Sequence, residues 1–217
     1  MHKSQLVLVL LVLVYTALAT HSFRPWMKAG DDPSDRARML LKQMTTEEKI
    51  AMVHGHPGSY VGNVDANTRL GIPQLTLEDG PQGVADQVKY VTAWPSALTV
   101  VASWDRKLLW QYGVAQAEEQ YAKGTNILLG PMINIARVPV GGRNFESFGE
   151  DPYLAAELVR EEIRGIQSQH VIACAKHFTD NNQESNRTTI SANVDERTQY
   201  ELYYPAFKAS VRPRWAL

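Results

Sequence analysis

LLGPMINIARVPVGGRNFESFGEDPY, residues 128–153, is the most informative segment of the chain, and ACAKHFTDNNQ, residues 173–183, complements it. In each segment a short apolar run is followed by a polar loop that contains basic side chains. Arg143 lies in the first loop, and Lys176 and His177 lie in the second. A buried strand whose carboxyl end opens on a pocket would order its residues in this way. The two segments therefore predict strands whose polar ends meet.

Four short apolar runs predict the strands of this sheet. They are apolar throughout rather than alternating, as expected of strands covered on both faces. Helical patterns separate them, which indicates a parallel sheet covered by helices and joined by right-handed crossovers. The runs are 74–77, 98–102, 126–129 and 171–175, and residues 55–69 are predicted to form a loop.

The predicted helices follow from capping residues and from apolar spacing. Thr45 and Glu48 form a capping-box pattern ahead of a helix that stops before Gly55. Asp105 is placed to cap another helix, and Gly124 to end it. Helices are thus expected at 34–44, 46–53, 105–123 and 153–169, and from Asp195 onward. The helix at 153–169 has Ala155, Val159, Ile163 and Ile166 on one face. The last helix is expected to bend or restart at Pro205.

Two architectures fit this alternation, a doubly wound sheet and a (β/α)8 barrel. The doubly wound fold usually carries a glycine-rich phosphate loop directly after its first strand. The pair Gly141-Gly142 instead lies inside a long loop, so we favour the barrel and expect no cofactor. A barrel takes about 250 residues, and this chain of 217 residues offers four strands. The expected fold is α/β, an incomplete (β/α)8 TIM-barrel-like domain comprising roughly the first half.

Residues 1–19 are predicted to be a cleaved signal peptide. His2 and Lys3 are basic, Leu6–Val14 is aliphatic, and Ala17-Leu-Ala19 is a small-x-small cleavage site. The aliphatic run is shorter than the ~20 residues that span a bilayer. We therefore expect a secreted, extracellular protein without membrane association after cleavage, and a membrane anchor is the alternative interpretation.

Composition narrows the class of partner. The chain is 44% hydrophobic and 21% charged, which is typical of a soluble globular domain. Its net charge of -1 shows no excess of positive charge of the kind that binds nucleic acid. Cys174 is the only cysteine, so no internal disulfide can form, and its apolar surroundings predict a buried, inert thiol. Asn186 begins the sequon Asn-Arg-Thr and is predicted to be glycosylated.

Asp79, Arg143, Lys176 and His177 all follow a predicted strand or lie in the loop after it. In a barrel these loops line one mouth, where active sites are found. Asp79 could instead shape a turn, and Arg143 could brace its loop by pairing with Glu146. The Lys-His pair is harder to explain structurally, because burying such groups without partners is costly.

This set of residue types suits a carbohydrate. A carboxylate accepts hydrogen bonds from vicinal hydroxyls while Lys, Arg and His donate, and charged partners make each bond worth ~1.5–3 kcal/mol. Trp94 or Trp104 could present an apolar face to a sugar ring, although core positions suit them as well. Metal binding is weakly supported, since His54 and His56 lie in a Gly/Pro loop. A serine hydrolase is also weakly supported, because the sequence contains no Gly-x-Ser-x-Gly motif.

A series of motifs in a fixed order adds a family resemblance. They are MTTEEKI at 44–50, LEDGPQG at 77–83, GRNFESFGEDP at 142–152, AKHF at 175–178, NQE at 182–184, DERT at 195–198 and ELYYPAF at 201–207. In order and approximate spacing these segments resemble glycoside hydrolase family 3, the β-glucosidase and β-xylosidase group. The resemblance covers about residues 34–211, so residues 20–217 are expected to be a partial N-terminal domain of that family.

The resemblance implies a (β/α)8-like domain whose mouth holds the non-reducing sugar of a β-linked oligosaccharide or glycoside. Asp79, Arg143, Lys176 and His177 would contact its hydroxyls, and Glu146 would orient Arg143. The family releases terminal β-D-glucose by a retaining mechanism, in which two carboxyl groups stand ~5–5.5 Å apart. The polar run after Lys-His-Phe favours the glucosidase-like branch over the branch that cleaves N-acetylglucosaminides.

The sequence also departs from the family pattern. The nucleophilic aspartate is expected in a later Ser-Asp-Trp-type strand and the acid/base glutamate in a further domain, and neither is present, so no catalytic residue is assigned here. Residues 212–217 also differ from the small-residue strand expected after Val211. We therefore expect an inactive N-terminal fragment, arising by truncation or gene-model error. A non-catalytic secreted sugar-binding protein and a fragment without function are the alternatives, and the oligomeric state is not predicted.

Overall fold

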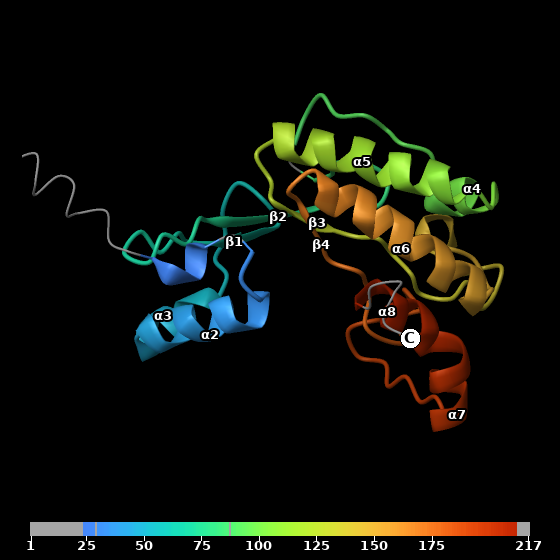
Figure 1. Ribbon diagram of the computed structural model, residues 1–217. Coiled ribbons are helices and arrows are strands. Elements are labelled where there is room, and N and C mark those ends of the chain that lie inside the picture. Colours follow the sequence, from blue (N-terminus) through green and yellow to red (C-terminus); the bar gives the residue numbers. More distant parts are fainter. Residues whose placement is uncertain (1–23, 29, 87, 212–217) are drawn as a thin grey trace, which may run out of the picture. The chain divides into compact units, whose positions relative to one another are not determined.

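The computed structural model describes residues 24–28, 30–86 and 88–211 (Figure 1). The predicted signal peptide, residues 1–19, and the divergent end, residues 212–217, lie outside the described residues. The chain divides into two compact units. The smaller unit holds residues up to Val53 together with Asn67–Pro73, and the larger holds His54–Ala66 and the chain from Gln74 onward.

The smaller unit contains the 3-10 turn η1 (Pro25–Met27) and the predicted helices α2 (Pro33–Gln43) and α3 (Thr46–Met52). The capping box of α3 is formed as predicted: Glu48 N donates to Thr45 Oγ1 at 3.2 Å, and Thr45 N donates to Glu48 Oε2 at 2.9 Å. Arg69 donates to the same Glu48 carboxylate and lowers its pKa to about 2. Local hydrogen bonds therefore define this helix start.

The larger unit is built on a four-stranded sheet in the order β1-β2-β3-β4. The pairs β2–β3 and β3–β4 are parallel, as predicted, and β1 runs antiparallel to β2. β1 lies where a loop was predicted, which is wrong; its three residues carry no apolar run, and the strand exists because it pairs with β2. The strands are β1 (Gly62–Val64), β2 (Leu75–Asp79), β3 (Ile127–Leu129) and β4 (Ile172–Ala173).

The two faces of the sheet are covered unequally. Leu128 packs on one face among Ala117 of α5 (Arg106–Ala122) and Ile166 of α6 (Pro152–Ser168), which lie side by side over the strands (Figure 1). On the opposite face, Ile172 is 51% exposed and Cys174 is also exposed. The prediction of a buried thiol is therefore wrong, because β4 is an edge strand and Cys174 points to its uncovered face. The result is a mixed α/β fold with an open sheet.

The predicted strand at 98–102 is a helix, α4 (Ala97–Val101). The Ser96 hydroxyl caps it by accepting from Thr99 N at 3.4 Å. Its buried residues are Ala97, Val100 and Val101, a spacing that places them on one helical face. A five-residue apolar run cannot be assigned by periodicity alone, and here the cap and the one-sided burial select the helix.

The predicted helices α5 and α6 form the main packing layer. Asp105 caps α5 and Asp151 caps α6, each by accepting two backbone N–H bonds. Two glycines let the helices approach closely, because a Cβ at Gly113 would overlap Glu162 O and one at Gly165 would overlap Trp110 O. The predicted inner face of α6 is confirmed, with Ala155, Val159, Ile163 and Ile166 all buried.

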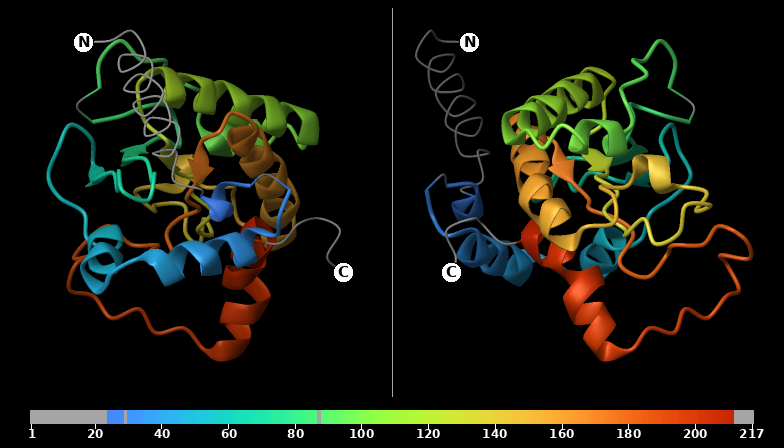
Figure 2. Two further views of the ribbon diagram at one scale, coloured as in Figure 1. Left: turned by 60° about the vertical axis from the view of Figure 1, so that its left-hand side comes forward. Right: turned by 90° about the vertical axis from the view of Figure 1, so that its right-hand side faces the viewer.

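Within the described residues, the chain from Glu196 to Val211 is helical, as predicted. Asp195 caps the first turn by accepting from Thr198 N at 3.0 Å. The helix then passes through a π-helical segment and resumes as an α-helix next to Pro205, which has no N–H to donate. The three parts are α7 (Glu196–Thr198), η3 (Gln199–Tyr203) and α8 (Tyr204–Val211), and α8 packs against α6 (Figure 2).

Candidate functional site

The carboxyl ends of the parallel strands bring distant polar residues to one edge of the sheet. Asp79 is the last residue of β2, and Lys176 lies shortly after β4. Arg143 lies in the loop between β3 and α6, at the start of the 3-10 turn η2 (Asn144–Glu146). Because parallel strands end on the same side, these three segments meet although nearly a hundred residues separate Asp79 from Lys176.

An ion pair joins Asp79 and Lys176 across this edge. Lys176 Nζ lies 2.5 Å from Asp79 Oδ1, and the two side chains are 13% and 39% exposed respectively. The lysine backbone is fixed on both sides, since Lys176 N donates to Pro131 O at 2.9 Å and Ile133 N donates to Lys176 O at 2.8 Å. A firmly held ammonium group therefore orients a carboxylate that remains accessible.

Polar side chains of α5 hold the turn that follows Asp79. Gln120 Nε2 donates to Asp79 O at 3.2 Å, while Gln116 Nε2 and the Tyr112 hydroxyl both donate to Pro81 O at 3.0 Å. All three donors are buried, and burial raises the pKa of Tyr112. The helix layer thus positions the carboxylate at the strand end, a role that no sequence pattern indicated.

Arg143 is held by carboxylates on two sides. Its Nε donates to Glu146 Oε1 at 2.5 Å, and its Nη1 lies 3.8 Å from Glu184 Oε1. The hydrogen bond that Arg143 donates to Glu146 is the main reason that the pKa of Arg143 is raised, so the guanidinium stays charged. The structure therefore places Glu146 beside Arg143, as the motif suggested, and adds Glu184.

Hydrogen bonds to Asn134 hold His177 in place. His177 N donates to Asn134 Oδ1 at 2.7 Å, Asn134 Nδ2 donates to His177 O at 2.9 Å, and the ring Nδ1 lies 3.1 Å from the same Oδ1. An amide oxygen only accepts, so Nδ1 carries the proton and Nε2 is an acceptor. Burial, and then the charges of Arg143 and Lys176, lower the pKa of His177 to about 4, which keeps the ring neutral at pH 7.

A cavity of about 370 Å³ lies between these groups. It brings together Asp79, Arg143, Glu146 and Lys176, whereas His177 is not among the described residues that line it. Its two cations and two carboxylates supply both donors and acceptors, a combination that suits a polyhydroxylated ligand. The rest of its wall is formed by residues 81–85 and 91–93.

The two tryptophans considered for sugar stacking lie elsewhere. Trp94 Nε1 donates to Glu119 Oε2 at 3.2 Å, and the ring packs edge-on against Tyr112 with centroids 6.5 Å apart. Trp104 is exposed. Neither is one of the described residues lining the 370 Å³ cavity, so the core interpretation holds for Trp94.

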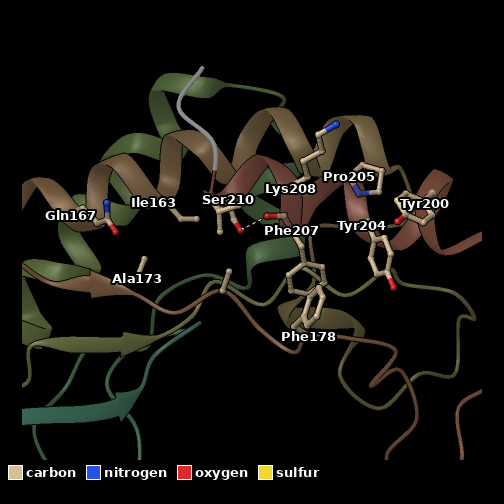
Figure 3. A pocket seen from close by; sticks show the side chains of 12 residues that line it. Ile163, Gln167, Ala173, Phe178, Tyr200, Tyr204, Pro205, Phe207, Lys208 and Ser210 are labelled. Atoms are coloured by element: carbon tan, nitrogen blue, oxygen red, sulfur yellow. Dashed lines mark hydrogen bonds between the residues drawn. The ribbon is translucent and has the colours of Figure 1, made fainter. Parts of the chain in front are cut away.

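A second, larger cavity of about 770 Å³ is apolar (Figure 3). Phe178 stacks on Tyr204 with ring centroids 6.0 Å apart and meets Phe207 edge-on at 5.2 Å. None of the described residues in its lining is a carboxylate, so it offers apolar contact rather than recognition of hydroxyls. We call it the α6–α8 groove; it is lined by Ile163, Gln167, Ala173, Ala175, Phe178, Tyr200, Tyr204, Pro205, Phe207, Lys208, Ser210 and Val211.

Asn134 and Glu184 contact the site although neither was assigned to it from the sequence. Asn134 is a polar residue within an otherwise apolar run, and a buried amide there requires partners. Glu184 lies in the motif at 182–184, but nothing in that motif indicates contact with Arg143. Its position follows only from the fold of the loop after β4.

The exposed turn at residues 185–189 carries the predicted glycosylation acceptor. Asn186 is exposed in a turn, as a glycosylation acceptor would have to be. In the described part of the chain, no three His, Cys, Asp or Glu side chains come together as a set that could bind a metal ion. No helix within residues 24–28, 30–86 and 88–211 is both long and apolar enough to span a bilayer.

The sequence profile of a known family matches most of the chain. Residues 45–213 match the sequence profile described as "Glycosyl hydrolase family 3 N terminal domain". The chain therefore belongs to glycosyl hydrolase family 3.

The relatives within this family are β-glucosidases. The chain is 44% identical over 186 residues to thermostable beta-glucosidase B of Acetivibrio thermocellus, covering 81% of this chain and 24% of the relative. It is 41% identical over 188 residues to beta-glucosidase BoGH3A of Bacteroides ovatus, covering 81% and 25%. The crystal structure of DesR, a β-glucosidase from Streptomyces venezuelae in complex with D-glucose, matches with a TM-score of 0.77 and 41% identity, over 81% of this chain and 23% of DesR. The chain thus spans about a quarter of the length of these relatives.

Proposed function

We propose that this chain forms the glucose-binding part of an enzyme that hydrolyses O-glycosidic bonds and releases terminal β-D-glucose from β-glucosides or oligosaccharides. The convergence of Asp79, Lys176 and Arg143 on one cavity carries the proposal. The β-glucosidase lineage of the family supports it, as does the D-glucose bound by DesR.

The proposed binding follows from the hydrogen-bonding capacity of the site. Asp79 accepts from two adjacent hydroxyls of the sugar while Lys176 holds the carboxylate in place. Arg143 donates from its amino groups, while His177, which does not line the cavity among the described residues, is left without a direct contact in this proposal. Hydrogen bonds that involve a charged partner contribute ~1.5–3 kcal/mol each, so a few of them suffice to select a pyranose by the orientation of its hydroxyls.

For the chain alone we propose binding without turnover. A retaining mechanism requires a nucleophilic carboxylate and a separate acid/base carboxyl group. Among the described residues of the cavity the two carboxylates are already engaged, Asp79 with Lys176 and Glu146 with Arg143. The reacting carboxylates of the enzyme would then be other groups than these two.

We also propose that the open sheet is part of a larger barrel fold. The parallel strands β2, β3 and β4, with α5 and α6 on one face, would form roughly the first half of a (β/α)8 barrel. We also propose that residues 1–19 direct secretion and that Asn186 carries a glycan. Mass spectrometry of the secreted protein, which reads the mature N-terminus and the mass on Asn186, tests both.

Calorimetry with D-glucose, paired with an aryl-β-glucoside hydrolysis assay on the same preparation, tests the proposed function. We expect D-glucose to bind, L-glucose to bind much more weakly, and hydrolysis to stay at background. Asp79→Asn should remove most of the D-glucose affinity. Absence of D-glucose binding by folded protein would contradict the glucose site, and hydrolysis well above background would contradict binding without turnover.

A further inference from the structure

Arg143 is contacted by two carboxylates that come from different loops. Glu146 lies in the same loop and accepts from Nε at 2.5 Å. Glu184 lies in the loop after β4, and its Oε1 is 3.8 Å from Nη1 of Arg143. Within the described residues the two amino groups of Arg143 make no hydrogen bond, so they remain available to a ligand.

Glu184 is itself held in place. Its other carboxylate oxygen, Oε2, accepts from Arg187 Nη1 at 3.1 Å. Its aliphatic stem lies over Gly142, where an added Cβ would stand 3.3 Å from Glu184 Cγ. That spacing is tighter than most side-chain contacts, so glycine next to Arg143 lets the carboxylate reach the guanidinium.

We propose that Glu184 is a positioning residue that aligns Arg143 for sugar binding, and this rests on the proposed function. Glu146 holds Nε, and Glu184 attracts Nη1 from across the loop boundary. With two points fixed, the plane of the guanidinium is set and its free N–H groups keep one orientation before the ligand arrives. Preorganisation of this kind lowers the entropy lost on binding.

The expected effect is modest because the pair is partly exposed. Glu184 is 37% exposed and its contact with Arg143 is an ion pair without a hydrogen bond. Such pairs contribute little individually, so Glu184→Gln should weaken D-glucose binding by about twofold to fivefold. The loss should shrink at high salt, because exposed charges are screened.

A double-mutant cycle separates positioning from a general structural role. Glu184→Gln is made in the wild-type chain and in an Arg143→Gln background, and D-glucose affinity is measured by calorimetry. We expect the twofold to fivefold loss in the first and no further loss in the second. The matched control, Glu118→Gln on the exposed face of α5, should leave affinity unchanged. Equal losses in both backgrounds, or no loss in the wild-type chain, would overturn the proposal.

A second readout does not require glucose. If the wild-type chain shows no D-glucose binding, the proposed function fails, and the Glu184–Arg143 coupling is then measured by urea denaturation of the same four proteins. Non-additive stability changes would support the coupling. Strictly additive changes would overturn it.

Discussion

At the scale of single residues, the difference in burial between Asp79 and Lys176 explains why the two side chains pair with each other. Lys176 is largely buried, and removing an ammonium group from water costs several kcal/mol unless a partner compensates. Asp79 compensates at 2.5 Å while keeping more of its own surface accessible. The lysine is therefore better understood as the support of the carboxylate than as an isolated donor.

Replacing Lys176 with methionine should remove that support. The variant keeps the length of the side chain but leaves Asp79 without its partner, so we expect D-glucose affinity to fall by about 10- to 100-fold, the equivalent of one charged hydrogen bond. Calorimetry measures the change. Lys107→Met, on the exposed surface of α5, is the matched control and should bind as wild type. Unchanged affinity in Lys176→Met would remove the lysine from the proposed site.

His177 should make stability depend on pH. Its folded-state pKa is lowered from 6.5 to about 4, first by burial and then by Arg143 and Lys176. Between these values the unfolded chain binds more protons than the folded one, so the free energy of unfolding falls as pH drops from 6.5 to 4. The slope should stay below ~1.4 kcal/mol per pH unit because the ring is only half-buried.

Urea denaturation at pH 7 and pH 5 measures this dependence. The difference between the two pH values should be smaller in His177→Gln than in wild type, whereas His170→Gln, at an exposed position, should behave as wild type. Equal pH dependence in wild type and His177→Gln would show that the histidine does not contribute.

At the scale of elements, helices with local signals could be predicted and elements that depend on distant partners could not. The caps at Thr45 and Asp105 are formed by residues within one turn of each helix start. β1 exists only through pairing with β2, and the five-residue run of α4 is ambiguous until its burial is known. The same reason applies in the site, where Glu184 reaches Arg143 from a different loop.

The α5–α6 contact yields a prediction at this scale. Alanine at Gly165 improves helix propensity by about 1 kcal/mol, but its Cβ would overlap Trp110 O. Overpacking typically costs ~1–3 kcal/mol, so Gly165→Ala should unfold at lower urea concentration than wild type. Gln111→Ala, at an exposed position of α5, isolates the propensity effect and should be neutral or slightly stabilising. A more stable Gly165→Ala would show that the helices have room to move apart.

At the scale of the whole molecule, the larger unit leaves two apolar surfaces exposed. One is the outer face of β4, where Ile172 is exposed. The other is the α6–α8 groove, where Phe178 is 73% and Tyr200 is 65% exposed (Figure 3). Edge strands and contiguous apolar patches are the usual sites of association between chains.

The purified chain should therefore bind the dye ANS, which fluorescence measures. It should also associate with itself as its concentration rises, which light scattering during size-exclusion chromatography measures. Charges placed on the two surfaces, Ile172→Lys with Tyr200→Lys, should reduce both signals because a lysine on an edge or in a patch opposes apolar contact. Val140→Lys is the matched control: Val140 is equally apolar and more exposed, but it lies in the loop before η2 and outside the groove. If the chain stays monomeric without ANS binding, or if Val140→Lys reduces the signals as much as the double variant, these surfaces are not what associates.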